Sequence, residues 1–149
     1  MTFQRIKELD ALLEQDFINF CLKSKPYDFC CMHSRNMSVH KIKEYMLFLF
    51  KECEMYTLKR NDKIQFFVAV SKKDDEAFVE FAFGQPFSVI SDFKSFRRFY
   101  SEINQKAMKF SGKITRKHKL KSYLKFLKQK DSEIQIILDN QEIAVLWNT

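Results

Sequence analysis

Cysteine and histidine supply the side chains that most often bind metals or act as nucleophiles, and in this chain they are scattered. The four cysteines stand at positions 21, 30, 31 and 53 and the three histidines at positions 33, 40 and 118. No pair has the C-x-x-C spacing or the i, i+4 spacing of a zinc site, so the sequence predicts no metal. A thiol and an imidazole are close in the run from Cys30 to His33, but catalytic partners are brought together by the fold. Cys21 and Cys53 fall on apolar helical stripes and are predicted to be core residues.

A basic run from Lys106 to Lys130 is the strongest charge feature of the chain. It contains ten bases and no acid, and Lys and Arg outnumber Asp and Glu by 26 to 19 overall, for a net charge of +7. Such a surface attracts nucleic acid or another polyanion through salt-sensitive contacts, although a solvated basic face without a ligand fits the pattern equally well. Arg97 and Arg98 could extend it from the preceding helix. The candidate anion-binding residues are Lys109, Lys113, Arg116, Lys117, Lys121, Lys125 and Lys128.

Length and composition predict one soluble domain. The 149 residues fit the commonest domain size, and 46% of them are hydrophobic, with 17 Phe to build a core. Only two Gly and two Pro occur, which leaves little material for glycine-built phosphate loops. No secretory leader precedes the cysteines and no apolar run reaches the ~20 residues of a membrane span, so we expect reduced thiols in a cytoplasmic compartment.

The run from Lys63 to Phe83 predicts a β-hairpin on which the other elements pack. Two arms rich in β-branched and aromatic residues, 64–70 and 77–83, flank a polar tip at 72–75. Few polar side chains interrupt the arms, which indicates strands that are covered on both faces. Residues 55–58 predict a short strand before the hairpin.

Four helices are predicted from apolar residues at helical spacing. The first covers residues 3–22 and the second residues 38–53, with Ser38 as N-cap. The third begins at Ser91 or Asp92 and ends near residue 108, with one face formed by Phe93, Phe96, Tyr100, Ile103 and Ala107. The fourth is the basic helix, whose buried positions are Leu120, Tyr123 or Leu124, and Leu127.

The C-terminus predicts a second hairpin, with arms 133–138 and 142–147. Its apolar positions face each other, with Ile134, Ile136 and Leu138 opposite Ile143, Val145 and Trp147. Residues 109–115 predict one further strand, and residues 29–32 could form a short one. The order ααβββαβαββ indicates an α/β or α+β domain over residues 1–149, with a mixed, mostly antiparallel sheet and helices on both faces.

This order of elements resembles that of the GCN5-related N-acetyltransferases (GNAT) over nearly the whole chain. In that family two helices lead to an antiparallel meander, and a helix, a strand, a helix and a terminal hairpin follow. The last helix of the family often carries a Tyr, a Lys two residues on, and then Gly-Phe. Tyr123 and Lys125 match the first part, whereas residues 126–128 depart from the second.

The resemblance implies an acetyl-CoA site, and this chain departs from the strongest motif of that site. Between the fourth strand and the next helix, the family places closely spaced glycines that let backbone N–H groups approach the pyrophosphate. Here residues 84–92 contain one glycine, Gly84, among bulky residues. Asp92 at the helix start would use the same N–H groups and place a negative charge where the phosphates should lie. We therefore predict weak or no acetyl-CoA binding and assign no cofactor-binding residue.

An active acetyltransferase also needs a base that takes a proton from the amine and an acid that protonates the departing thiolate. The resemblance implies Glu80, on the second arm of the central hairpin, as the base and Tyr123 as the acid. The same residues also fit structural roles, Glu80 as an exposed or paired strand residue and Tyr123 as a core aromatic.

The sequence leaves three functions open. The leading hypothesis is a GNAT-like protein with a degenerate acetyl-CoA loop, used for binding or assembly with weak or no catalysis. The chain is similar in size to small glycine-poor proteins of this fold in short-tailed phages, including virion components, which places it in a virion or the host cytoplasm. The second hypothesis is a basic module that binds nucleic acid or an acidic protein, and the third is an active N-acetyltransferase. The most informative observation for choosing among these hypotheses is whether the fourth and fifth strands diverge, because in the GNAT fold CoA enters through that opening.

Overall fold

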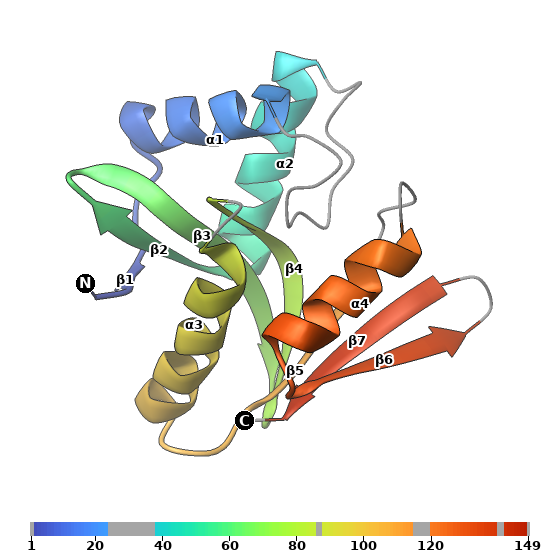
Figure 1. The fold of residues 1–149 in the computed structure, drawn as a ribbon. Helices are drawn as coiled ribbons and strands as arrows, with labels where there is room; N and C mark the ends of the chain where they lie inside the picture. Colours follow the sequence, from blue (N-terminus) through green and yellow to red (C-terminus); the bar gives the residue numbers. More distant parts are fainter. Residues whose placement is uncertain (1, 24–37, 86–87, 115–119, 140–141, 149) are drawn as a thin grey trace.

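One continuous mixed sheet organises the computed structural model, which describes residues 2–23, 38–85, 88–114, 120–139 and 142–148 (Figure 1). Its strands are β1 (Gln4–Arg5), β2 (Glu54–Arg60), β3 (Lys63–Lys73), β4 (Glu76–Gly84), β5 (Lys109–Ile114), β6 (Ile134–Asp139) and β7 (Glu142–Asn148). The helices are α1 (Ala11–Lys23), α2 (Val39–Glu52), α3 (Val89–Ile103) and α4 (Leu120–Lys130). The strand order is β1-β2-β3-β4-β5-β7-β6, and only β4 and β5 are parallel. The predicted fold class is therefore confirmed.

The central hairpin predicted over residues 63–83 is present as β3 and β4. The turns on either side of β3 use residues with positive φ, Asn61 and Asp62 before it and Asp74 after it. Asn and Asp tolerate this region better than other non-glycine residues, so the sequence favours tight turns at both places. Both faces of the hairpin are buried, since Phe66 and its neighbour Phe67 belong to two different cores.

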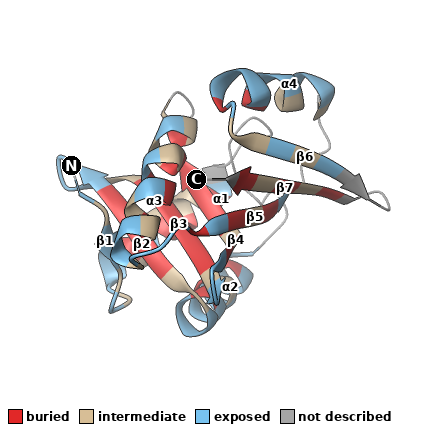
Figure 2. Ribbon diagram, turned by 90° about the horizontal axis from the view of Figure 1, so that it is seen from below, coloured by how far each residue is buried: buried red, intermediate tan, exposed pale blue. Residues whose placement is uncertain are grey.

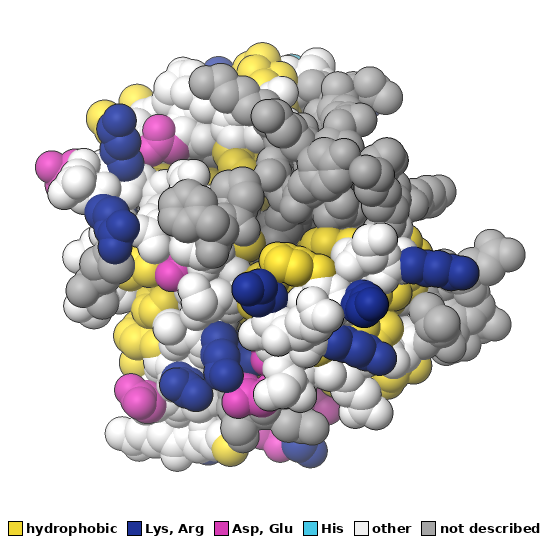
Figure 3. All heavy atoms as spheres, viewed as in Figure 1, with side chains coloured by type: hydrophobic (Ala, Val, Ile, Leu, Met, Phe, Trp, Pro, Cys, Tyr) yellow, Lys and Arg dark blue, Asp and Glu magenta, His cyan; other side chains and the backbone are white. Residues whose placement is uncertain are grey.

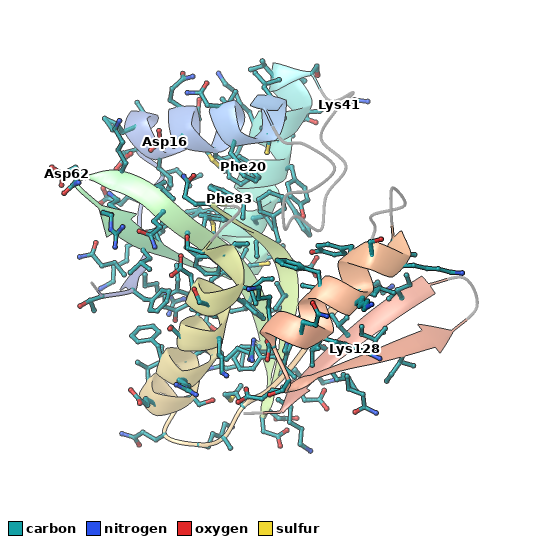
Figure 4. All side chains as sticks on the ribbon, viewed as in Figure 1. Asp16, Phe20, Lys41, Asp62, Phe83 and Lys128 are labelled. Carbon is teal, nitrogen blue, oxygen red and sulfur yellow. The ribbon has the colours of Figure 1, made fainter. Side chains whose placement is uncertain are left out.

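The two hydrophobic cores lie on opposite faces of the sheet. One packs α1 and α2 against β2, β3 and β4, and Phe20 of α1 stacks on Phe83 of β4 with ring centroids 3.9 Å apart (Figure 4). The other packs α3 and α4 against the sheet and includes Phe96, Leu127 and Trp147. Figure 2 shows that the strands between these helices are largely buried.

The first helix is shorter than predicted. Residues 4–5 form β1 on β2, and α1 begins at Ala11, where the carboxylate of Asp10 accepts the N–H of Leu13 at 2.7 Å. Phe3 packs in the core of α3, whereas Ile6 packs in the core of α1 and α2. The prediction of a helix from residue 3 was therefore wrong, because the segment begins with a short strand whose two neighbours pack on opposite faces of the sheet. The strand considered at residues 29–32 lies outside the described residues.

Helix α3 begins at Val89, earlier than the predicted cap at residue 91 or 92, and ends at Ile103 instead of near residue 108. Gln105 takes a φ of 57°, which helical backbone does not allow. Ile103 is 49% exposed and Ala107 lies beyond the helix, so neither belongs to the buried face. The other predicted members of that face are buried, namely Phe93, Phe96 and Tyr100.

The C-terminal hairpin has the predicted register. Ile134 is opposite Trp147, Ile136 opposite Val145 and Leu138 opposite Ile143. The same β7 pairs with β5 on its other side, which joins this hairpin to the rest of the sheet. Among the described helices, none has the length and apolar character needed to cross a lipid bilayer.

Candidate active-site region and basic helix

The parallel strands β4 and β5 are paired only at their first residues. Their register runs from Glu76 opposite Lys109 to Val79 opposite Gly112. Beyond that point β4 continues beside β3 as far as Gly84, and β5 continues beside β7. The two halves of the sheet diverge from this short seam (Figure 1). This divergence was the feature expected of a sheet that admits an extended cofactor between two strands.

Glu80 lies at the point of divergence. In the pairing of β3 with β4, Val79 is opposite Val70 and Phe81 is opposite Ala69, so Glu80 is the extra residue of a β-bulge. The hydroxyl of Tyr45 donates to its backbone carbonyl at 3.5 Å. The Glu80 side chain is half-buried, and its charge adds to the rise in the pKa of Cys53.

Tyr123 lies on the face of the sheet that α3 and α4 cover. It lies in α4 and packs, half-buried, against the core formed with α3. The structure thus places Glu80 at the divergence of β4 and β5, and Tyr123 in the helix that covers the α3 side of the sheet. Their roles as base and acid stay a prediction.

The start of α3 packs closely against β4. The carbonyl of Gln85 accepts the N–H groups of Ser88 and Val89, at 3.0 and 2.9 Å, so these donors are already used. A Cβ on Gly84 would lie 2.9 Å from Cγ2 of Val89, which shows that this glycine allows close packing of α3 on β4. Asp92 differs from expectation, because its carboxylate accepts from the side chain of Gln65 at 2.9 Å instead of capping the helix. Its negative charge nevertheless lies in the first turn of α3.

The predicted anion-binding residues are divided between two faces. Lys121, Lys125 and Lys128 are exposed on α4 and lie opposite the buried Leu127. Figure 3 shows dark-blue side chains over this helix, and Figure 4 shows Lys128 pointing outward. Lys109 and Lys113 alternate along β5 with Phe110, which is buried in the α3 core, so they face the other side of the sheet. Arg116 and Lys117 lie outside the described residues.

Arg97 does not extend this surface, and the prediction that it could was wrong. Its side chain is fully buried, and Nη2 pairs with Asp131 at 2.9 Å and with Glu133 at 3.1 Å. The guanidinium also lies over the rings of Phe93 and Trp147, at 5.1 and 5.6 Å from their centroids. Arg97 therefore joins α3 to the segment between α4 and β6. A cluster of acids after α4 was the one sequence signal that could have indicated this partner.

The two described cysteines are poor nucleophiles. Burial raises the pKa of the Cys21 thiol to about 12, which keeps it protonated, and Cys21 lies in the core as predicted. Burial also raises the pKa of Cys53, although its contact with Ser71 at 3.6 Å acts in the other direction. Cys53 caps the end of α2 and is half-buried, so the predicted core position was only partly right. Cys30, Cys31 and His33 lie outside the described residues.

Comparison with solved structures identifies the fold. A PaiA N-acetyltransferase from Thermoplasma acidophilum in complex with coenzyme A matches with a TM-score of 0.63 at 8% identity, covering 100% of both chains. An aminoglycoside 6'-N-acetyltransferase complexed with coenzyme A matches with a TM-score of 0.64 at 8% identity, covering 99% of this chain and 97% of that one. The N-acetyltransferase PseH of Campylobacter jejuni in complex with acetyl-CoA matches at 0.63 and 11% identity, covering 99% and 98%.

At the level of sequence, no family model and no curated protein matches the chain. The structural matches show that this chain has the GNAT fold, as the order of its elements indicated. Identities of this size carry the fold and leave the activity to be argued from the residues of the chain itself.

Proposed function

We propose that this chain is a GNAT-fold protein with a degenerate acetyl-CoA loop, a phage-type virion or assembly component that binds a partner and has weak or no catalysis. The observation that carries the proposal is the carbonyl of Gln85, which accepts the N–H groups of both Ser88 and Val89. A pyrophosphate at a helix N-terminus is held by such N–H groups. Their use within the chain takes up two of the donors that the usual mode of binding would need.

Two further features support the same proposal. The side chain of Val89 occupies the space beside Gly84 that a closely approaching ligand would need. Asp92 adds a negative charge in the first turn of α3, where the helix dipole would otherwise favour an anion. The proposal places the protein in the host cytoplasm or in the virion.

Calorimetric titration and thermal shift with acetyl-CoA test this proposal. A genuine cofactor at 100 times its dissociation constant stabilises a protein by about 2.7 kcal/mol, which is easily measured. We expect no saturable heat and no rise in Tm at millimolar acetyl-CoA. An Asp92→Asn variant should behave in the same way, because Gln85 still occupies the N–H groups. Saturable binding to the unmodified chain would overturn the proposal.

The second candidate is an active N-acetyltransferase, and the divergence of β4 and β5 at Glu80 is the observation that favours it. In that case Glu80 would act as the base and Tyr123 as the acid toward an amine. The test is release of free thiol from acetyl-CoA in the presence of a panel of amines. Turnover that falls about 100-fold or more in Glu80→Gln and Tyr123→Phe would establish this function.

A basic module for a polyanion is the third candidate, favoured by the exposure of Lys121, Lys125 and Lys128 on one helix. Phosphate contacts of this kind supply affinity without base recognition and weaken with salt. The division of the basic residues between two faces limits the contact to the α4 side.

A further inference from the structure

The outer edge of the sheet at β6 is open in the part of the chain that the structure describes. β6 is the last strand of the order, and β7 is its one neighbour there. Along an antiparallel edge strand, every second residue points its N–H and C=O away from the paired strand. Edges of this kind are usually protected by Lys, Pro or a covering segment. β6 reads Ile-Gln-Ile-Ile-Leu-Asp and carries neither residue.

Helix α4 forms a groove with this edge. The groove has a volume of about 590 Å³ and is lined by Leu124, Lys125, Lys128, Gln129 and Ile136. The four helix residues lie at i, i+4 spacing in two adjacent rows, so they form one face of α4. Ile136 belongs to β6 itself. Because α4 and β6 are neighbours at the outer end of the sheet (Figure 2), a strand added to β6 would run beside this groove.

The lining of the groove selects the chemistry of its occupant. Leu124 and Ile136 form an apolar part, and Lys125 and Lys128 place exposed positive charges beside it. The acids nearest in sequence, Asp131 and Glu133, are already paired with Arg97. An occupant with an apolar side chain between two acidic ones, at alternate positions of an extended strand, would match the groove. A second copy of this chain would instead bring the same lysines together, which like-charge repulsion disfavours.

From this geometry we infer that an extended acidic and apolar segment of a partner protein binds by adding a strand to β6 beneath α4. Backbone hydrogen bonds to the open edge would supply affinity, and the groove would read the alternate side chains. This inference rests on the proposed function of the chain as a binding component and names the site and the class of its partner.

The test uses a fluorescent seven-residue peptide with Glu, Ile and Glu at alternate positions and threonines between them. We expect saturable binding by anisotropy, with a dissociation constant below about 1 mM. A peptide with Lys in place of Glu should bind at least about 10-fold more weakly. Methylating the backbone nitrogens of one alternate set of residues should abolish binding, and methylating the other set should leave it, because only one edge of the peptide meets β6.

Variants of the protein locate the site. Lys125→Glu together with Lys128→Glu should raise the dissociation constant of the peptide by about 10-fold or more. Lys51→Glu with Lys106→Glu makes the same change of charge at exposed positions away from the groove and should have little effect. Circular dichroism and thermal unfolding of each variant show whether the fold is kept.

Several outcomes would overturn the inference. These are no saturable binding by the peptide, equal inhibition by both methylation patterns, or equal effects of the two lysine pairs. Light scattering could instead show a dimer that the substitution Ile137→Lys on β6 dissociates. That result would assign the edge to a second copy of this chain. A parallel titration with acetyl-CoA distinguishes failure of this inference from failure of the proposed function. If neither the peptide nor acetyl-CoA binds, only this inference fails. If acetyl-CoA binds, the proposed function fails, whatever the peptide does.

Discussion

Nη2 of Arg97 lies 2.9 Å from Oδ2 of Asp131, and both side chains are buried, at 0% and 2% exposure. The pair joins the middle of α3 to the residue that follows α4, across the outer half of the sheet. Two other nitrogens of this guanidinium, Nε and Nη1, are buried without a hydrogen-bond partner among the described residues. The ion pair between α3 and the end of α4 therefore depends on a buried guanidinium that has few hydrogen-bond partners.

Asp131→Asn should lower the free energy of unfolding by about 3 kcal/mol, because it leaves a buried cation with one partly exposed carboxylate. Adding Arg97→Met should restore part of this loss, since the buried charge is then gone. Lys94→Met is the control, as Lys94 contacts Glu133 at 3.9 Å and is one-third exposed. Its loss should cost less than about 1 kcal/mol. Urea unfolding measures all three, and a double variant less stable than Asp131→Asn would contradict this account.

Tyr100 predicts the response of stability to alkaline pH. Its hydroxyl donates to Glu54 at 2.6 Å, and Tyr56 donates to the same carboxylate at 3.1 Å. Burial first, and then this carboxylate, raise the pKa of Tyr56 to about 12 and also raise the pKa of Tyr100. Stability should be full below about pH 10 and fall as the pH rises toward about 12, because the unfolded chain loses phenolic protons that the folded chain keeps.

Tyr100→Phe should remove one tyrosine from this dependence, reducing the slope above pH 10 by about 1.4 kcal/mol per pH unit. At neutral pH the variant should be less stable by about 1.5–3 kcal/mol through the lost bond to a carboxylate. Urea unfolding at a series of pH values measures both quantities. The same slope in the variant and the unmodified chain would show that Tyr100 ionises as easily folded as unfolded.

Gly84→Ala should destabilise the fold by about 1–3 kcal/mol through overpacking. The new Cβ would lie 2.9 Å from Val89 and 3.2 Å from the backbone carbonyl of Gln65. Gly112→Ala is the matched control, because its Cβ would meet its nearest neighbour at 3.6 Å, an ordinary contact. Val89→Ala should partly rescue Gly84→Ala. Equal losses for the two glycines in thermal unfolding would exclude close packing at Gly84 as the cause.

Polyanion binding by α4 predicts a graded loss on heparin. Replacing Lys121, Lys125 and Lys128 with Gln should shift elution to lower salt, because each replacement removes a positive charge that would contact the polyanion. A triple variant at Lys51, Lys63 and Lys106 removes the same charge elsewhere and serves as control. If both variants elute at the same salt concentration, retention depends on net charge alone, and α4 is not a specific binding surface for the polyanion.

The parts of the fold that could be predicted from sequence are those in which neighbours in the chain are also neighbours in space. The register of Ile134 opposite Trp147 follows from alternation across a short turn. Ser38 caps α2 by accepting from the N–H of Lys41 at 3.2 Å, as its residue type suggests. Both depend on contacts a few residues apart, which local patterns describe well.

The predictions that failed depended on contacts distant in sequence. The helix predicted from residue 3 is replaced at its start by β1, which pairs with β2 about fifty residues on and leaves Phe3 and Ile6 on opposite faces of the sheet. Arg97 follows the pattern of an exposed base, and its burial is set by Asp131 and Trp147. For the candidate site, the strand that carries Glu80 was predicted from sequence, whereas the bulge that sets this residue at the divergence depends on tertiary pairing. The catalytic role of Glu80 stays a prediction.

The short seam between β4 and β5 has a consequence for the order in which the chain folds. The hairpins on either side close locally, whereas the four residue pairs of the seam join segments more than thirty residues apart. Chain entropy opposes such a closure until the flanking ribbons exist. We therefore expect the seam to form after the rate-limiting step, so Phe110→Leu should mainly accelerate unfolding. A φ-value near 1 at this position would reverse that order.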